Sequence, residues 1–591
     1  MQISQCWTDE LPYADTLKLL CDLARSHARE GGVHGSNLLA LLDKEDFAGL
    51  CTYNLDLTSP DWDVLQLYHC RQAIAFFKKL ECLDLGVDKE KAAFEKFKAA
   101  EQSCRMSNDL FRSYARGRVC LRPRDVRLLE AVRRKIASVL GRCPSLSELD
   151  MTFGPGATTA TKKPEACPTM KMAAGLQCSA DLVASGLLPS LLRELPHLMV
   201  EYCEGEDVEG SVEDGQLVFY TTSRISVQIH DARLEFVPKS ATTFRTITVE
   251  PMLNTLLQAG IRKWMKRRLS RAGIDLSDQT RNQRLAKEGS ITGELATLDL
   301  ASASDTISYS LVKLLLPEDW FRLLNAARSS TVNYRGSSFA LEKFSAMGNA
   351  TTFPLESLIF WAITTSACEG EGGQIGIYGD DIICPVSRVT SVVRALNFCG
   401  FEVSSSKSFW FGPFRESCGA DFYKGFSVRP YYQKEPISGR SLFVLHNFYF
   451  RAMMFDYADF VRELIPPTLR IFGPDGYGDG HLLGEWSPLR SRKLREKGYC
   501  GVSFETFSLR GKKIRPPFAG DWISPLYSIY TRAREDLLPV FIYAGGPLGD
   551  RAVSVPLRES SPVDMDKGGY PMWVVPGSDG YERRKIYTFC T

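Results

Sequence analysis

Two adjacent carboxylates, Asp380 and Asp381, are the residues whose types and spacing point most directly to chemistry. They end the string Tyr378-Gly-Asp-Asp, which has apolar and β-branched residues on both sides. Two unpaired carboxylates at about 4 Å repel each other by about 4 kcal/mol at an effective dielectric constant near 20, so a cation would stabilise them. A divalent metal held there can activate an attacking oxygen and neutralise a leaving one. The alternative is an ordinary Gly-Asp turn on a surface hairpin, and the string alone does not decide between the two.

Asp299 is the candidate for a third carboxylate. A two-metal site needs carboxylates from more than one strand, because one hairpin tip cannot surround both ions. Asp299 ends a short apolar strand predicted over residues 296–299, and Asp305 follows at the predicted start of the next helix. The alternative roles are a turn residue at a strand end for Asp299 and a helix N-cap for Asp305.

Cations and glycines near these carboxylates suggest nucleotide binding. Lys239 and Arg245 lie on a polar loop that enters a predicted strand, where they could hold a triphosphate, although a plain surface loop would look similar. Gly348 and Asn349 precede a predicted helix and would permit close approach of the backbone to a ligand. Lys407 follows a later strand.

The elements that must position these residues can be predicted from the pattern. Residues 374–387 are expected to form a β-hairpin with Gly379-Asp380 as a type II′ loop and both carboxylates at an exposed tip. A helix over residues 352–367 is expected to pack on that hairpin. Helices over residues 15–28 and 88–104 each begin with an Asp that would cap them. Residues 205–235 are expected to form surface strands.

Two basic segments stand out from a chain whose net charge is only +2. A helix predicted over residues 253–271 carries its cations in its C-terminal half, where either a solvated face or contact with phosphates would explain them. Residues 490–515 hold nine Lys or Arg against two Glu. Because the overall charge is small, a nucleic-acid surface would have to be a local channel.

Composition limits the class of protein. A chain of 591 residues is too long for one core, and 44% apolar with 24% charged residues is typical of soluble globular proteins. No apolar run reaches the length of a membrane span, and the N-terminus lacks the apolar run of a secretory signal. Seventeen cysteines without a CxxC pair indicate reduced thiols in a cytoplasm rather than a zinc site. The string at 475–480 is not an EF-hand, because its twelfth position is Trp486.

The order of these features carries a family resemblance. Between about residues 150 and 480 the strings occur in the order FGPGATT, VPKSATTFRTITVEP, GIDLSDQTRNQR, ATLDLASASDTIS, SAMGNATTFPLESLIF, YGDDII, GPFRESCG and PDGYGDG. This order resembles the palm of a right-hand RNA-dependent RNA polymerase. More narrowly, it resembles the replicase catalytic (β) subunit of single-stranded RNA bacteriophages, the leviviruses. The first 150 and the last 100 residues match only by position and length.

The resemblance implies an α+β right-hand polymerase with fingers, a palm built of an antiparallel sheet and helices, and a thumb. Residues 1–240 would form the N-terminal region and fingers. Residues 241–430 would form the palm, with parts of the fingers interleaved. Residues 431–591 would form the thumb and C-terminal region. The implied activity is RNA synthesis on an RNA template, replicating and transcribing a viral RNA genome.

The resemblance also implies roles for individual residues. Asp299, Asp380 and Asp381 would be catalytic and would bind two Mg²⁺ ions, which Mn²⁺ could replace. The nucleotide would contact Lys239, Arg245, Asp305, Gly348, Asn349 and Lys407. The template strand would be guided by Gly154, Gly156 and Thr158, through backbone contacts that read no sequence. Lys407 would stand near the pyrophosphate and could donate a proton.

Partners and location follow from the resemblance alone. The substrates would be single-stranded RNA and nucleoside triphosphates, in the cytoplasm of a bacterial host and without a membrane. Host elongation factors Tu and Ts, and in some members a ribosomal protein, would be partners.

Two departures and two rival functions remain open. Five residues separate Asp299 from Asp305 where many polymerases have four, and Glu356 stands where Asn is common. A reverse transcriptase shares Tyr-x-Asp-Asp, but it usually places a bulky aromatic near the first Asp, whereas residues 301–304 here are small. An inactive RNA-binding scaffold with the same shape is the other alternative.

Overall fold

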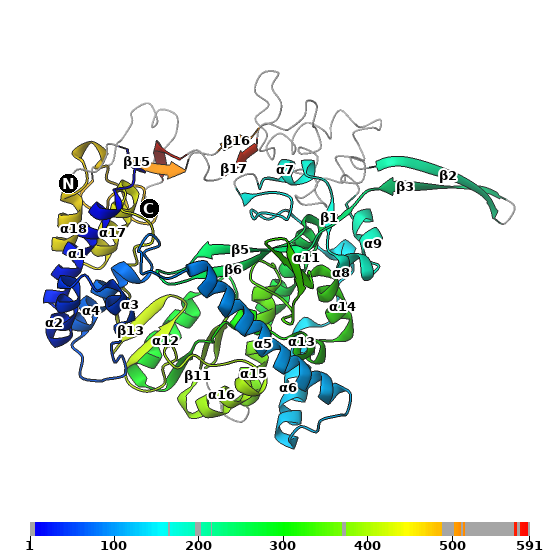
Figure 1. Ribbon diagram of the computed structural model, residues 1–591, viewed down its shortest axis with the longest axis horizontal. Helices are drawn as coiled ribbons and strands as arrows, with labels where there is room; N and C mark the ends of the chain where they lie inside the picture. The colour runs from blue at the N-terminus through cyan, green and yellow to red at the C-terminus, as the bar shows by residue number, and fades with distance from the viewer. Residues whose placement is uncertain are drawn as a thin grey trace.

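The computed structural model describes residues 6–163, 166–195, 203–213, 216–368, 374–486, 502–509, 512–514, 573–575 and 580–588. Helices dominate and several small sheets lie between them, which confirms the α+β class (Figure 1). The predicted basic region at residues 490–515 lies mostly outside the described residues.

The N-terminal part is helical, as predicted. Its helices are α1 (Tyr13–Arg29), α2 (Gly32–Asp43), α3 (Phe47–Thr52), α4 (Val64–Lys78), α5 (Lys89–Ala115) and α6 (Pro123–Leu140). Asp88 caps α5 as expected, accepting a hydrogen bond from the backbone N–H of Lys91 at 2.9 Å. The prediction that Asp15 caps the first helix was wrong. Pro12, with φ of −52°, starts α1 at Tyr13, so that Asp15 lies inside the first turn.

The middle of the chain supplies the helices around the central sheets. They are α7 (Pro168–Ala173), α8 (Ala180–Ala184), α9 (Leu188–Arg193), α11 (Met252–Arg271), α12 (Thr280–Thr292), α13 (Tyr309–Leu315), α14 (Glu318–Ala327), α15 (Thr352–Ala367) and α16 (Val389–Phe398). Helices α17 (Gly439–Arg451) and α18 (Phe455–Glu463) follow. Figure 1 shows α5 crossing the molecule diagonally, from the region of α1–α4 toward α6.

Three sheets matter for the candidate site. Strands β10 (Gly376–Tyr378), β11 (Asp381–Pro385) and β7 (Leu295–Leu298) form an antiparallel sheet in that order. Strands β6 (Phe244–Val249), β5 (Ala232–Pro238), β8 (Thr331–Tyr334) and β9 (Ser337–Ala340) form a second sheet, with β5 and β8 parallel. Strands β12 (Phe414–Ser417), β13 (Ala420–Tyr423) and β14 (Phe426–Ser427) form the third.

The remaining strands form two-stranded pairs. Strands β2 (Cys203–Glu213) and β3 (Gln216–Ile225) make a long hairpin that extends away from the body (Figure 1), in agreement with the surface strands predicted there. The other pairs are β1 (Gln177–Cys178) with β4 (Gln228–Ile229), β15 (Val502–Leu509) with β18 (Tyr581–Thr588), and β16 (Lys512–Ile514) with β17 (Trp573–Val575).

Two large hydrophobic cores hold the described residues together. One is built mainly from α6, α11, α13–α16 and the β7–β11 sheet. The other joins apolar residues of 7–83 to apolar residues of 409–482. Residues 7–83 and 409–482 therefore fold against each other, and the domain boundaries at residues 240 and 430 stay a prediction.

Candidate active site

The β7–β11 pairing brings Asp299 and Asp381 to neighbouring positions. The last paired residues are Leu298 and Ile382, and Asp299 and Asp381 stand one step further in the same antiparallel register. Residues directly opposite in such a ladder have Cα atoms about 4.5–5.5 Å apart and share a face of the sheet. Two carboxylates that are distant in sequence thus meet where strands β7 and β11 of the three-stranded sheet end.

The predicted hairpin is present and its loop is Gly379-Asp380. Tyr378 pairs with Asp381 across it, and Gly379 has φ of +62°. Asp380 has no positive φ, so the positive value falls only at the first central position, as a type II′ turn requires. A side chain on Gly379 would come within 2.5 Å of the Phe353 ring, so glycine is required here for space as well as for conformation.

The hairpin tip is not exposed, and that part of the prediction was wrong. Helix α15 covers the tip, and the backbone N–H of Gly379 donates to Oγ of Ser357 at 3.0 Å. Packing of this helix on the hairpin was predicted and is confirmed. Its consequence is that Asp380 and Asp381 are only partly accessible.

Burial and mutual repulsion make these carboxylates hard to ionise. Burial, and then the charge of Asp299, raise the pKa of Asp380. Burial raises the pKa of Asp381 to about 6, with Asp380 adding to the shift, although hydrogen bonds from the Cys418 backbone and Ser417 oppose it. A positive charge at this place would reverse the repulsion.

Four cations lie near one another here, and the charges of two of them, Lys407 and Arg245, oppose the rise in the pKa of Asp380. Nζ of Lys407 lies 3.1 Å from Oδ2 of Asp299. Lys239 and Arg245 lie nearby, since after burial it is the charges of Lys96, Arg245 and Lys407 that lower the pKa of Lys239. The structure thus brings the predicted Lys239, Arg245 and Lys407 together. It also adds Lys96 of α5, which sequence reasoning missed because nothing in an ordinary amphipathic helix marks that position.

Asp305 does not cap a helix. It ends a single 3₁₀ turn over residues 303–305, and α13 begins at Tyr309, so the alternative role as an N-cap was wrong. Its carboxylate instead accepts a hydrogen bond from Nζ of Lys343 at 2.9 Å, and Lys343 is fully buried. Glu101 lies 3.2 Å from the same ammonium.

Gly348 and Asn349 shape the turn that leads into α15. Gly348 has φ of +114°, and a side chain there would approach the carbonyl oxygen of Thr248 to 2.0 Å. Asn349 is buried, and its side-chain oxygen accepts hydrogen bonds from the N–H and hydroxyl of Thr351 at 2.9 and 2.7 Å. The close approach predicted at Gly348 is therefore to β6, and contact of either residue with a nucleotide stays a prediction.

Glu356, on the first turns of α15, is an unusual buried acid. Only 6% of the residue is exposed, and its Oε2 has no hydrogen-bond partner in the described structure. Burial, followed by the charges of Asp380 and Asp305, raises its pKa well above the ordinary value. Oε1 lies 3.2 Å from the place a side chain on Gly379 would take, so the carboxyl group lies against the hairpin of β10 and β11.

The predicted template loop is open at its two glycines. Gly154 and Gly156 are exposed with free space beside their backbones, and the carbonyl of Gly154 accepts from Nζ of Lys171 at 2.6 Å. Thr158 is buried, and its backbone hydrogen-bonds with that of Thr161 at 3.0 Å. Of the three residues predicted to guide the template, the two glycines are exposed and Thr158 is not.

The donor set fits a hard divalent cation. Three carboxylates supply oxygen ligands, which Mg²⁺ prefers, and the Lys407 ammonium already places a positive charge beside Asp299. As the side chains stand, no group of three His, Cys, Asp or Glu within the described ranges converges closely enough to hold a metal ion. Asp299 is turned to Lys407 and Asp381 to Ser417, whose hydroxyl donates to it at 3.2 Å.

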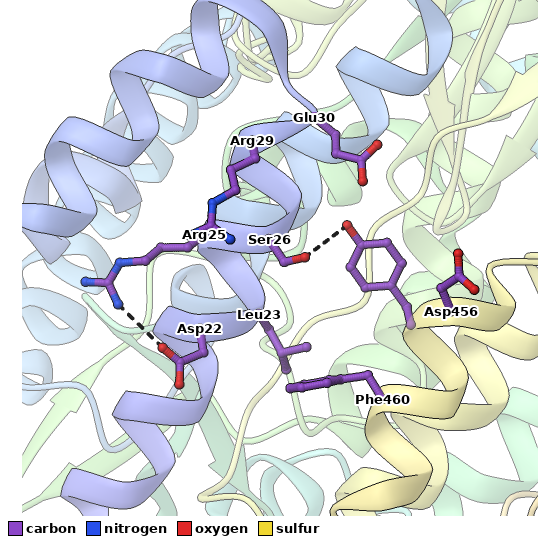
Figure 2. A pocket seen from close by; sticks show the side chains of 9 residues that line it. Asp22, Leu23, Arg25, Ser26, Arg29, Glu30, Asp456 and Phe460 are labelled. Atoms are coloured by element: carbon purple, nitrogen blue, oxygen red, sulfur yellow. Dashed lines mark hydrogen bonds and ion pairs between the residues drawn. The ribbon is translucent and has the colours of Figure 1, made fainter.

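Two other features lie apart from this site. A cavity of about 570 Å³ between α1 and α18 is lined by residues such as Arg29, Glu30 and Phe460, and Figure 2 shows these side chains around it. None of the predicted site residues lines it. No described helix is long and apolar enough to cross a membrane.

Comparisons with known proteins show which proteins this chain is similar to. Residues 35–454 match the family described as RNA replicase, beta-chain. The chain is 35% identical over 435 residues to the RNA-directed RNA polymerase subunit beta of Escherichia virus Qbeta, covering 69% of this chain and 67% of the relative. It is 48% identical over 211 residues to the RNA-directed RNA polymerase beta chain of Escherichia phage MS2, covering 35% of this chain and 38% of the relative. Among solved structures, the RNA-dependent RNA polymerase of a human picobirnavirus aligns with 57% of this chain and 70% of its own at 12% identity, with a TM-score of 0.36.

Proposed function

This chain belongs to the RNA replicase β-chain family and is an RNA-directed RNA polymerase, and from that premise we propose that it extends RNA by two-metal nucleotidyl transfer at the Asp299–Asp381 edge. The observation that carries the proposal is the register that sets Asp299 opposite Asp381, beside a hairpin tip bearing Asp380. Carboxylates in this arrangement, next to several cations, suit a reaction in which a polyphosphate is attacked and a pyrophosphate leaves.

Asp299, Asp380 and Asp381 would hold two Mg²⁺ ions, with Mn²⁺ able to replace them. When bound, such ions lower the pKa of an attacking 3′-hydroxyl and stabilise the departing pyrophosphate. The protein's own contribution is a strand pairing that holds its partly buried carboxylates close together. Their raised pKa values support this role, because a site that disfavours bare charge gains most from a bound cation.

The cations have a separate task. Lys239 and Arg245, with Lys96 added by the structure, would neutralise the triphosphate of the incoming nucleotide. Lys407 would stand near the pyrophosphate as a proton donor. Its ammonium lies 3.1 Å from Oδ2 of Asp299, so a cation bound by Asp299 would compete with it and leave it to the substrate.

The other predicted residues have supporting roles. Asp305, Gly348 and Asn349 would lie beside the ribose, and Gly154, Gly156 and Thr158 would guide the template through backbone contacts. Residues 1–240 would include the fingers, 241–430 the palm and 431–591 the thumb, with the N-terminal helices packed against the thumb region through the shared core.

The biological setting is part of the same proposal. The enzyme would replicate and transcribe a viral RNA genome from single-stranded templates in the cytoplasm of a bacterial host. Elongation factors Tu and Ts, and in some members a ribosomal protein, would join it there.

Substitution of Asp380 tests the catalytic proposal. Asp380→Asn removes one negative charge without changing the shape of the side chain, so incorporation of a ribonucleotide on an RNA template should fall by about 100-fold or more, equivalent to about 2.7 kcal/mol. Binding of the RNA itself should persist. Asp109→Asn, a matched change on the exposed surface of α5, should have no effect.

Two results would overturn the proposal. Unchanged incorporation by Asp380→Asn would leave the chain as an RNA-binding scaffold at this site. A clear preference for deoxyribonucleotides would contradict the assignment of RNA as product. Measuring incorporation against Mg²⁺ concentration in wild type and variant separates loss of metal binding from loss of fold.

A further inference from the structure

Helix α11 carries more positive charge than its own stability explains. Its 20 residues include no acid and six cations, which are Arg262, Lys263, Lys266, Arg267, Arg268 and Arg271. The helix macrodipole favours cations only within the last turn, which accounts for Arg268 and Arg271 but not for those before them. In a chain with a net charge of only +2, this concentration needs another cause.

Two of the six have structural partners. Nζ of Lys263 lies 2.7 Å from Oδ2 of Asp150, and Nε of Arg268 donates to the carbonyl of Val139 at the end of α6 at 3.0 Å. Lys266, Arg267 and Arg271 have no ion pair with any described residue. Arg267 is held in place by an aromatic neighbour, since its guanidinium lies 5.2 Å from the centre of the Trp264 ring.

These three cations line one cavity of about 420 Å³. The other residues that line it are Ser270, Asp275, Leu276 and Ser277. Asp275 is already engaged, because its carboxylate accepts hydrogen bonds from the N–H and hydroxyl of Ser277 at 2.8 and 2.6 Å. Three cations against one carboxylate leave a net charge of +2 in the cavity, together with a second hydroxyl from Ser270.

The wall of the cavity is connected to the catalytic hairpin. Arg281 of α12 donates to the carbonyl of Gly273, just beyond the cavity, at 2.7 Å, and to the carbonyl of Ile375, just before β10, at 3.1 Å. Gln279 donates to the hydroxyl of Tyr378 at 3.2 Å. The loop after α11 therefore joins the cavity to the strand that leads into Asp380.

We propose that Lys266, Arg267 and Arg271 form a phosphate site for the backbone of a single RNA strand, outside the catalytic site. Cations with hydroxyls beside them bind phosphate oxygens without reading bases, so the contact is independent of sequence. Its connection to β10 suits a strand that passes close to the catalytic hairpin. An acidic protein surface is the competing occupant, and the experiment separates the two.

The test measures the binding of full-length protein to a fluorescent single-stranded RNA oligonucleotide across a range of KCl concentrations. The variant is Lys266→Gln with Arg271→Gln, which leaves the Arg267–Trp264 contact in place. Loss of two phosphate contacts should lower the steepness of log affinity against log salt by about 1.4, since each contact contributes about 0.7 for a single strand. Affinity at low salt should fall about tenfold, and equally for oligonucleotides of different sequence.

Two controls make the result specific. Lys18, on α1, and Lys44, directly after α2, are both exposed. Lys18→Gln with Lys44→Gln removes the same charge and should leave the salt dependence of RNA binding unchanged. Lys266→Arg with Arg271→Lys keeps the charge and should restore binding, whereas a merely structural role would not be rescued in this way.

Three outcomes would overturn the proposal. One is an unchanged salt slope in the Gln variant, and another is a loss confined to one RNA sequence. The third is unchanged RNA binding together with lost binding of polyglutamate, which would assign the cavity to an acidic protein surface. Equal thermal midpoints of variant and wild type establish that folding is not the cause of any loss.

Discussion

At the scale of single residues, the candidate site is a group of carboxylates close enough to repel one another. Asp380 and Asp381 are buried enough that their pKa values rise, and Asp299 pairs with the Lys407 ammonium at 3.1 Å. Glu356 adds a fourth acid, and burial raises its pKa well above the ordinary value. Because these acids repel one another, a bound cation would stabilise the site. Burial raises the pKa of Asp380, Asp381 and Glu356, and such shifts are typical of functional sites.

Glu356 should behave as a neutral acid in the metal-free protein. Because burial raises the pKa of its carboxyl group well above the ordinary value and so favours the uncharged form, Glu356→Gln should leave the free energy of unfolding at pH 7 within about 1 kcal/mol of wild type, without Mg²⁺. Glu356→Ala should cost about 2 kcal/mol or more, because it removes buried atoms and leaves a cavity. Urea unfolding of both variants checks this.

The control for Glu356 is Glu288→Gln, the same change at an exposed position of α12. A large loss of stability in Glu356→Gln would show that the carboxyl group is ionised in the fold and paired with a cation. We therefore expect wild type and Glu356→Gln to have similar free energies of unfolding, and Glu356→Ala to have a clearly lower one.

At the scale of elements, strand register and one helix decide the geometry. The β7–β11 ladder fixes Asp299 opposite Asp381, and α15 closes over the hairpin through Ser357 and Phe353. A shift of the register by one residue would move Asp299 to the other face of the sheet. The apolar run of β11 and the burial of all four residues of β7 oppose such a shift.

Local patterns were enough to predict these elements, and long-range packing was not. Gly379-Asp380 between β-branched runs predicted the hairpin, and the capping Asp88 predicted the start of α5, because each depends only on near neighbours. The burial of the hairpin tip depends on α15, and Lys96 reaches the site only through the path of α5 across the molecule. Neither fact is encoded in a short window of sequence. The pairing of Asp305 with Lys343 was missed for the same reason.

Glu250 links two elements and should make stability depend on pH. It lies between β6 and α11 and is fully buried, with Ser329 donating to its carboxyl group. Burial raises its pKa from 4.5 to about 7. Since the folded pKa exceeds the unfolded one, the folded state binds the extra proton between these values. The contribution of Glu250 to stability is therefore fully present below pH 4.5, and about 3 kcal/mol of it is lost as pH rises through 7.

Glu250→Gln removes this titrating group and keeps the shape of the side chain. Its free energy of unfolding should fall less than that of wild type between pH 5 and pH 8, and the difference between the two proteins is the quantity to measure. Glu288→Gln again serves as the exposed control and should follow wild type. Parallel pH profiles for wild type and Glu250→Gln would contradict the raised pKa.

At the scale of the whole molecule, two segments that lie far apart in the sequence, residues 7–83 and 409–482, are built into one unit. Apolar residues of 7–83 and 409–482 share a core, and the backbone N–H of Leu11 donates to the carbonyl of Ile437 at 2.7 Å. The side chain of Gln72 likewise hydrogen-bonds to the backbone of Tyr431. The helices α1 to α4 therefore act as a support for β12–β14 and α17, rather than as a separate leading domain.

Asp421 joins these two halves by charge, and its substitution tests whether they are mutually dependent. The residue is fully buried on β13, between Arg71 of α4 and Arg429, whose guanidinium lies 2.8 Å from it. Asp421→Asn keeps the volume but removes the carboxylate that the two guanidiniums share, so that Arg71 loses its ion pair and Arg429 keeps Glu416, at 3.4 Å. Removing one partner of a buried ion pair costs about 3–5 kcal/mol.

The exposed pair of Arg322 with Glu318 on α14 is the matched control, and Glu318→Gln should cost at most about 1 kcal/mol. Urea unfolding gives both values, and limited proteolysis should release an N-terminal fragment faster from the Asp421→Asn protein alone. If that variant loses no more stability than the control, the N-terminal helices are held by apolar packing and hydrogen bonds, and the ion pairs across the shared core contribute little.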